Sequence, residues 1–140
     1  MIILVAEDEA LIALMLQLAL TIAGYRVLGP AADVAEALHL CERERPHLAL
    51  IDIRLRNGDS GAALARTLKA RWAVPCLFLS AQAAEARAAS DAALGVIDKP
   101  YDPVEVVDAV AAVGEMLAGR QPRSMPRRLQ LFSRPGGPAG

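Results

Sequence analysis

The chain has 140 residues, a formal net charge of −1 and a hydrophobic fraction of 54%. This length suits one ordinary domain and is too short for two well-packed ones. No run of about 18 or more apolar residues lacks a charged or polar break, which argues against a membrane span. The N-terminus passes from an apolar run directly into three acidic residues, an order foreign to signal peptides, so we expect a cytoplasmic protein.

Charge is unevenly distributed along the chain. Residues 119–140 hold five arginines and no acid, together with four prolines and four glycines. Such a composition favours a disordered, basic tail rich in Pro, Gly and Arg, which could contact nucleic acid or an acidic protein surface or simply be solvated. All 16 acidic residues lie in residues 1–118, which we assign to one domain. The tail is too short for a DNA-binding domain, and no membrane contact is expected.

Short apolar runs alternate with segments of helical spacing through the first 118 residues. The runs, each expected to be a buried strand, are Ile2–Ala6, Tyr25–Leu28, Leu48–Ile51, Cys76–Leu79 and Gly95–Ile97. The helical segments are Ala10–Ala23, Val34–Arg43, Ala62–Ala70, Ala83–Ala93 and Val104–Leu117. Repeated βαβ units of this kind predict an α/β fold: a five-stranded parallel sheet with helices on both faces, doubly wound and flavodoxin-like.

Several residues mark where the predicted helices begin and end. Gly24 is suited to stop the first helix. Asp33, Ser60 and Asp102 can cap the second, third and fifth helices, and Pro103 suits a first helical position.

Polar side chains follow four of the five predicted strands. Glu7 and Asp8 follow the first, Asp52 ends the third, and Ser80 and Lys99 follow the fourth and fifth. In a parallel sheet these positions meet at one edge, where ligands of such folds bind.

Three carboxylates brought together repel one another unless a cation compensates. Mg²⁺ suits such a site, because it binds one or two carboxylates, keeps waters and contacts phosphate oxygens. Asp52 could then act as a nucleophile towards a phosphoryl donor. Lys99 could bind phosphate oxygens, and Ser80 could donate a hydrogen bond to the acyl phosphate.

Each of these residues also has a simpler interpretation. Glu7 and Asp8 could only stabilise the N-terminus of the first helix. Ser80 could be a loop residue and Lys99 a surface lysine. A charge after the apolar run Leu48–Ile51 is costly unless it is used, and the shared sheet edge favours a functional site.

On these residues the chain resembles the receiver domains of bacterial two-component response regulators, over about residues 1–118. The matching positions are Glu7-Asp8, Asp52, Gly61 at the start of the third helix, Ser80-Ala81 and Lys99-Pro100-Tyr101. As a set spaced over five strands, they are specific to that family.

The resemblance implies a single-domain response regulator acting in a phosphorelay. Asp52 would accept a phosphoryl group from a histidine kinase or a histidine phosphotransfer protein, and Ser80 and Lys99 would contact that group. Mg²⁺ would be held by Glu7, Asp8, Asp52 and the backbone carbonyl of Arg54. The Lys99–Pro100 bond would be cis. The downstream protein is not specified, and no separate substrate turnover is expected, so we do not expect an enzyme.

The sequence departs from the family at three places. Val96 stands where an aromatic residue usually rotates on phosphorylation, and a β-branched side chain has little rotamer freedom. The stretch from Ser80 to Lys99 is about three residues short, which predicts a short or irregular fourth helix. The loop after Asp52 lacks the usual Met-Pro pair. We therefore expect output through order in the Ser80–Ala84 loop rather than through a ring rotation.

Three other interpretations remain. A degenerate receiver could bind proteins without phosphorylation, which Val96 and the short fourth segment favour. A small phosphatase could use Asp52 as its nucleophile, but Arg54 stands where the second acid is usual. A dinucleotide-binding fold is disfavoured, because no Gly-x-Gly-x-x-Gly follows the first strand.

Cys41 and Cys76 are expected to be buried free thiols.

Overall fold

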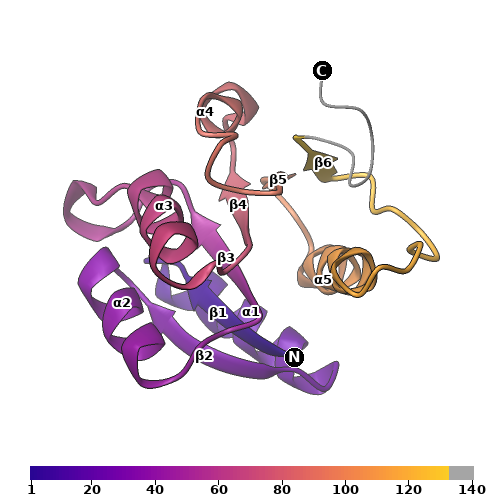
Figure 1. Ribbon diagram of the computed structural model, residues 1–140, viewed down its shortest axis with the longest axis horizontal. Helices are drawn as coiled ribbons and strands as arrows, with labels where there is room; N and C mark the ends of the chain where they lie inside the picture. The colour runs from indigo at the N-terminus through magenta and orange to yellow at the C-terminus, as the bar shows by residue number, and fades with distance from the viewer. Residues whose placement is uncertain (133–140) are drawn as a thin grey trace.

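A computed structural model describes residues 1–132 as one sheet flanked by helices (Figure 1). The strands are β1 (Ile2–Ala6), β2 (Arg26–Ala31), β3 (Leu48–Asp52), β4 (Cys76–Ser80), β5 (Gly95–Asp98) and β6 (Leu129–Leu131). Within the described residues their order is β2-β1-β3-β4-β5-β6. The first five are parallel, as the alternation of apolar and helical segments predicts, and β6 is antiparallel to β5.

Helices cover both faces of the sheet (Figure 1). They are α1 (Ala10–Ile22), α2 (Val34–Arg43), α3 (Gly61–Trp72), α4 (Ala83–Ala88) and α5 (Pro103–Leu117), with a short 3-10 turn η1 at Arg56–Gly58. Buried side chains of α2, α3 and α4 pack in one core cluster, and those of α1 and α5 pack in a second. The predicted doubly wound architecture is confirmed. No helix within residues 1–132 is long and apolar enough to cross a membrane.

Strand β1 shows why these apolar runs become central strands. Ile3 and Val5 face the α1–α5 cluster, whereas Leu4 and Ala6 face the α2–α3 cluster, and all four are fully buried. A strand covered on both faces needs apolar side chains at every position, so a continuous run replaces the alternation of a half-exposed strand.

The predicted helix caps are present. The side chains of Asp33 and Ser60 accept hydrogen bonds from the backbone N–H groups of Glu36 and Ala63. Asp102 caps α5 in the same way, and the side chain of Glu105 accepts a hydrogen bond from the Asp102 N–H. These bonds satisfy donors that the first helical turn leaves unpaired.

Helix α4 has only six residues and ends at Ala88, so the prediction of a short or irregular fourth helix is confirmed. The wider segment Ala83–Ala93 is not helical throughout, because residues 89–91 form turns and residue 92 a bend. The structure thus has little α4 surface between β4 and β5.

The chain after α5 differs from the sequence expectation. Strand β6 pairs with β5, and its ends are fixed by hydrogen bonds from the Asp98 N–H to the Arg128 carbonyl (3.1 Å) and from the Phe132 N–H to the Leu94 carbonyl (2.9 Å). Leu129 is buried against the α1–α5 cluster. The prediction of disorder over 119–140 is therefore wrong for this strand, and residues 133–140 lie outside the described part.

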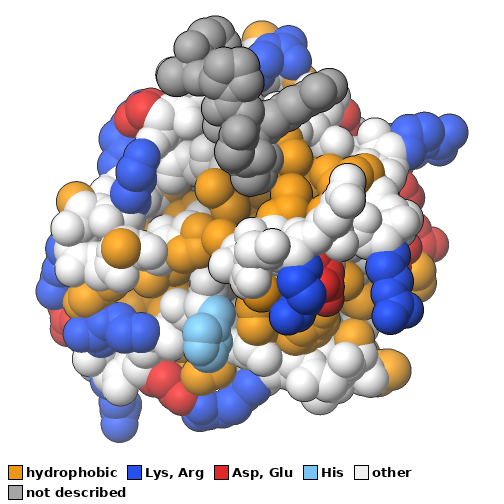
Figure 2. Space-filling view, turned by 45° about the vertical axis from the view of Figure 1, so that its right-hand side comes forward, with side chains coloured by type: hydrophobic (Ala, Val, Ile, Leu, Met, Phe, Trp, Pro, Cys, Tyr) orange, Lys and Arg blue, Asp and Glu red, His pale blue; other side chains and the backbone are white. Residues whose placement is uncertain are grey.

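Two features explain why this segment pairs with β5. The outer edge of β5 would otherwise present unpaired backbone groups, which a further strand satisfies. Gly95 lets the two backbones approach closely, because a Cβ there would lie 2.4 Å from the Gln130 carbonyl oxygen. Figure 2 brings the α5–β6 side forward and shows hydrophobic side chains across its middle, with Lys and Arg around the margin.

The chain's single tryptophan lies at the C-terminal end of α3. Two guanidinium groups lie over its ring, those of Arg45 at 4.4 Å and Arg71 at 4.1 Å from the ring centroid. Helix α3 starts next to the end of β3 and ends at the opposite edge of the sheet, so Trp72 is at the far end of the molecule from the polar residues that follow the strands.

Candidate functional site

The register of the parallel strands brings the predicted site residues together. Strands β1, β3, β4 and β5 end at the same edge of the sheet. Glu7, Asp52, Ser80 and Lys99 are consequently placed on neighbouring strand ends, although up to 92 residues separate them in sequence.

Three carboxylates meet at this edge. One oxygen from each of Glu7, Asp8 and Asp52 lies within 4.8 Å of the others. Glu7 and Asp52 are buried, with 2% and 7% of their surface exposed, and Asp8 is exposed. The cluster therefore has two buried acids and one that faces solvent.

Lys99 is the cation of the cluster. Its Nζ lies 2.5 Å from Asp52 Oδ2 and 3.2 Å from Glu7 Oε1. Burial lowers the pKa of Lys99, but the hydrogen bonds and charges of Asp52 and Glu7 outweigh that effect and leave its pKa above the ordinary value. Lys99 is thus a fixed positive charge beside the Asp52 carboxylate.

One lysine does not neutralise the cluster. Burial, followed by the hydrogen bond and negative charge of Asp52, raises the pKa of Glu7 from 4.5 to about 8, although Lys99 lowers it. Burial is the largest cause, but the negative charge of Asp52 acts in the same direction, so a further cation at the cluster would favour the ionised form of Glu7. Clustered carboxylate oxygens that need a further positive charge are suited to bind a hard divalent cation such as Mg²⁺.

Ser80 lines the same edge, but its hydroxyl is engaged within its own loop. It accepts a hydrogen bond from the Gln82 N–H (2.9 Å) and donates one to the Gln82 carbonyl (3.1 Å). Any contact of Ser80 with a phosphoryl group would therefore require these bonds to rearrange. No pattern in the sequence predicts this role for Gln82.

The backbone of Arg54 contacts the acidic cluster, whereas its side chain points away from the cluster towards α4. Its N–H donates to Asp52 Oδ1 at 3.0 Å, while its guanidinium group pairs with Glu85 of α4 at 3.1 Å. Arg54, Glu85, Ser80 and Asp52 line an open cavity of about 380 Å³ over the acidic cluster. Glu85 is a site neighbour that sequence reasoning missed, because its proximity depends on how α4 folds back.

The backbone of Gly61 packs closely against the end of β3. A Cβ at this position would lie 2.0 Å from the Asp52 carbonyl oxygen, and the Gly61 N–H donates to the Ile53 carbonyl at 2.8 Å. The absence of a side chain lets α3 start directly against the backbone that carries Asp52.

Val96 is fully buried in the α2–α3 cluster, and an aromatic ring approaches this cluster from another part of the chain. Phe132, the residue after β6, packs against Phe78 of β4 with ring centroids 6.4 Å apart and planes tilted by 53°. Alternating apolar residues at Leu129 and Leu131, followed by Phe132, were the available sequence signal for this packing.

The comparisons with known proteins agree with this geometry. The family model described as the response regulator receiver domain matches residues 3–111. The chain belongs to this family. The Lys99–Pro100 peptide bond is cis, as the resemblance implies.

Several named proteins are similar to this chain. The chain is 31% identical to the transcriptional regulatory protein PdtaR of Mycobacterium tuberculosis over 111 residues, which cover 77% of this chain and 54% of that protein. It therefore spans about half the length of this relative. The crystal structure of the response regulator PhyR from Brucella abortus matches with 28% identity and a TM-score of 0.69, over 84% of this chain and 50% of PhyR. The receiver domain of NtrX from Brucella abortus matches with 27% identity and a TM-score of 0.67, over 75% and 91%.

Proposed function

We propose that this receiver accepts a phosphoryl group on Asp52 in a Mg²⁺-dependent reaction and so transmits a phosphorelay signal. The observation that carries the proposal is the placement of the Asp52 carboxylate, held by Lys99 at 2.5 Å and open to a cavity among two further acids. Receiver domains interact with histidine kinases or phosphotransfer proteins, and either is the donor that we expect.

The transfer itself needs little from the protein beyond positioning and charge. A carboxylate oxygen of Asp52 forms the new bond to phosphorus, while the bond between phosphorus and the donor's imidazole nitrogen breaks and its electron pair stays on the nitrogen. The Arg54 N–H holds the other carboxylate oxygen in place. Lys99 is positioned to turn from the carboxylates to the phosphoryl oxygens.

Glu7, Asp8, Asp52 and the backbone carbonyl of Arg54 are the groups that would hold Mg²⁺. When bound, the ion neutralises the charge of the acids and of the transferring group. Ser80 would hydrogen-bond the acyl phosphate once its hydroxyl leaves Gln82. We expect no turnover of a separate substrate, so the protein is a phosphoacceptor rather than an enzyme. The two free, buried thiols support a reducing, cytoplasmic location.

Phosphorylation by a small donor tests the proposal. Wild-type protein incubated with acetyl phosphate and Mg²⁺ should gain one phosphoryl group by intact mass spectrometry. Asp52→Asn should gain none. Asp91→Asn is the matched control, because Asp91 is an exposed carboxylate paired with Arg66 outside the site, and it should be labelled like the wild type.

Two results would contradict the proposal. Undiminished labelling of Asp52→Asn would place the acceptor elsewhere. A wild-type protein that neither labels nor responds to Mg²⁺ would favour the phosphorylation-independent binding module.

A further inference from the structure

A tyrosine hydroxyl beside the acidic cluster has no hydrogen-bond partner. Tyr101 Oη is buried, and no atom of residues 1–132 accepts or donates a hydrogen bond to it. A buried hydroxyl without a partner costs free energy that phenylalanine, with the same ring, would avoid. Packing of the ring therefore does not explain why the residue is a tyrosine.

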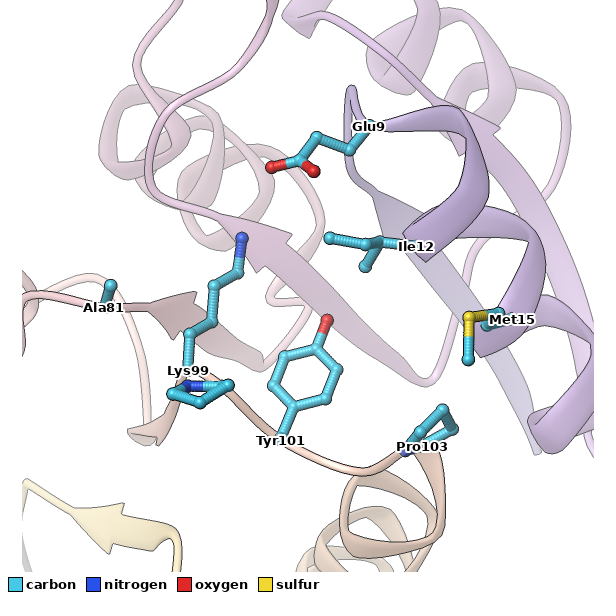
Figure 3. A pocket seen from close by; sticks show the side chains of 8 residues that line it. Glu9, Ile12, Met15, Ala81, Lys99, Tyr101 and Pro103 are labelled. Carbon is cyan, nitrogen blue, oxygen red and sulfur yellow. The ribbon is translucent and has the colours of Figure 1, made fainter.

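The hydroxyl is directed towards the site. Tyr101 lines an apolar pocket of about 260 Å³ together with Glu9, Ile12, Met15 and Lys99. In Figure 3 its oxygen points into the space between the Lys99 amine and Ile12, on the side of the Glu9 carboxylate. Burial and then the negative charges of Glu7, Asp52 and Glu9 raise the pKa of Tyr101, so the hydroxyl keeps its proton and can donate a hydrogen bond.

Glu7 lacks a close hydrogen-bond donor once Lys99 moves away. Glu7 Oε1 accepts from Lys99 Nζ at 3.2 Å, and Oε2 accepts only a long bond, 3.4 Å, from the Glu9 N–H. A cation bound among these acids would repel the Lys99 ammonium from Glu7, and under the proposed function Lys99 then turns to the phosphoryl group. Glu7 then loses its closest donor while its side chain remains fully buried.

We propose that Tyr101 is a positioning residue whose hydroxyl donates a hydrogen bond to the Glu7 carboxylate when the acidic site is occupied. This inference rests on the proposed function, because it assumes a cation at the cluster. The hydroxyl would hold Glu7 in place for the cation and take over the role of Lys99. Among residues 1–132 the hydroxyl has no partner, so the cost of its burial would be compensated by the bond to Glu7.

The proposal predicts two effects of Tyr101→Phe with opposite sign. The metal-free variant should be more stable than the wild type, because an unpaired buried hydroxyl is gone. Its Mg²⁺ affinity should be about tenfold lower, because a hydrogen bond to a charged group is lost. A residue that serves only packing would change the stability of the metal-free and Mg²⁺-bound protein equally.

Calorimetric titration with Mg²⁺ and thermal unfolding in EDTA and in excess Mg²⁺ measure both effects on the full chain. Tyr25→Phe is the matched control, since Tyr25 is the only other tyrosine and does not line the site; it should bind Mg²⁺ like the wild type. The expected result is a higher unfolding temperature for Tyr101→Phe in EDTA with a smaller Mg²⁺-induced increase than in the wild type.

The outcomes separate this inference from the function on which it rests. If wild type and Tyr101→Phe bind Mg²⁺ within twofold and gain the same stabilisation, the tyrosine proposal is overturned and the function is untouched. If the wild type itself fails to respond to Mg²⁺, the proposed function fails and the tyrosine proposal falls with it.

Discussion

The α1 surface and the outer edge of β5 are both apolar, yet one is bare and the other is covered by the chain itself. On α1, Leu11, Leu14, Met15, Leu18 and Ile22 are each at least 45% exposed. At the edge of β5, strand β6 satisfies the backbone, Leu129 is buried, and Phe132 packs against Phe78.

The difference separates two uses of apolar side chains. At the β5 edge they stabilise the fold. On α1 about half or more of each side chain remains in solvent, so they contribute less to the fold, and the N-terminal part of the helix borders the pocket that contains Lys99. A bare apolar surface beside the proposed acceptor Asp52 would suit the docking of a protein donor. Stability should therefore depend on the β6 side, and phosphoryl transfer between proteins on the α1 side.

The largest expected effect concerns pH, and it belongs to the acidic site alone. Glu7 keeps its proton in the folded, metal-free state up to a pKa of about 8, whereas the unfolded chain loses it near 4.5. Stability is therefore full below pH 4.5 and lost as pH rises towards 8, by up to about 1.4 kcal/mol per pH unit. Urea unfolding in EDTA across this range measures it.

Glu7→Gln should flatten this dependence, because the titrating group is gone. Gln130→Ala, on the β6 side, should leave the slope as in the wild type. A wild-type stability that is constant between pH 5 and pH 8 would contradict the origin assigned to it. Saturating Mg²⁺ should also remove the fall in stability with rising pH, since the ion favours the ionised Glu7 carboxylate.

Truncation of the buried side chain of β6 should produce the next largest change in the free energy of unfolding. Leu129→Ala removes a side chain that is only 8% exposed and should lower the free energy of unfolding by about 2 kcal/mol. Leu11→Ala on α1, where the side chain is 70% exposed, should change it by less than about 0.5 kcal/mol. Equal losses in urea unfolding would mean that β6 does not stabilise the fold as described.

The α1 side should respond in phosphoryl transfer rather than in stability. Leu14→Ser, near the start of the exposed surface, should slow transfer from a histidine phosphotransfer protein about tenfold. Labelling by acetyl phosphate should not change, because a small donor needs no docking surface. Ile22→Ser is the control: it is 85% exposed but lies at the far end of α1, and transfer to it should keep the wild-type rate. A loss with both donors would indicate damage to the site instead.

The smallest effect concerns the polar contacts that join β6 to its neighbours. Gln130 donates to Asp98 at 2.7 Å and accepts a long bond from Arg87 of α4 at 3.4 Å. A double-mutant cycle of Gln130→Ala and Arg87→Ala should give a coupling of about 0.5 kcal/mol or less, since both groups are exposed. A coupling above about 1 kcal/mol would show that α4 depends on β6 more than its length suggests.

Much of the fold is predictable from local sequence. Strands β1, β3, β4 and β5 begin at the residues that the apolar runs indicate, and Asp33, Ser60 and Asp102 cap helices as predicted. These features depend on short-range patterns and on burial of both faces of a parallel sheet. Strand β6 was not predicted, because its three residues form no stable strand alone and become one only by pairing with β5.

The site shows the same division. Its acids and Lys99 are predictable, because parallel strands bring their carboxyl ends to one edge whatever the details of packing. The engagement of Ser80 by Gln82, the ion pair of Arg54 with Glu85 and the unpaired hydroxyl of Tyr101 are not, because each depends on the path of a loop.

The position of Trp72 has a consequence for spectroscopy. It is the chain's only tryptophan, and the guanidinium groups of Arg45 and Arg71 contact its ring at the end of α3 opposite the acidic cluster. Its emission should change when the guanidinium groups separate from the ring on unfolding, but it should be nearly silent when an ion binds near Asp52. Intrinsic fluorescence thus reports the folding of this protein in isolation from the occupancy of its site, and a second tryptophan placed near α4 would give the site a signal of its own.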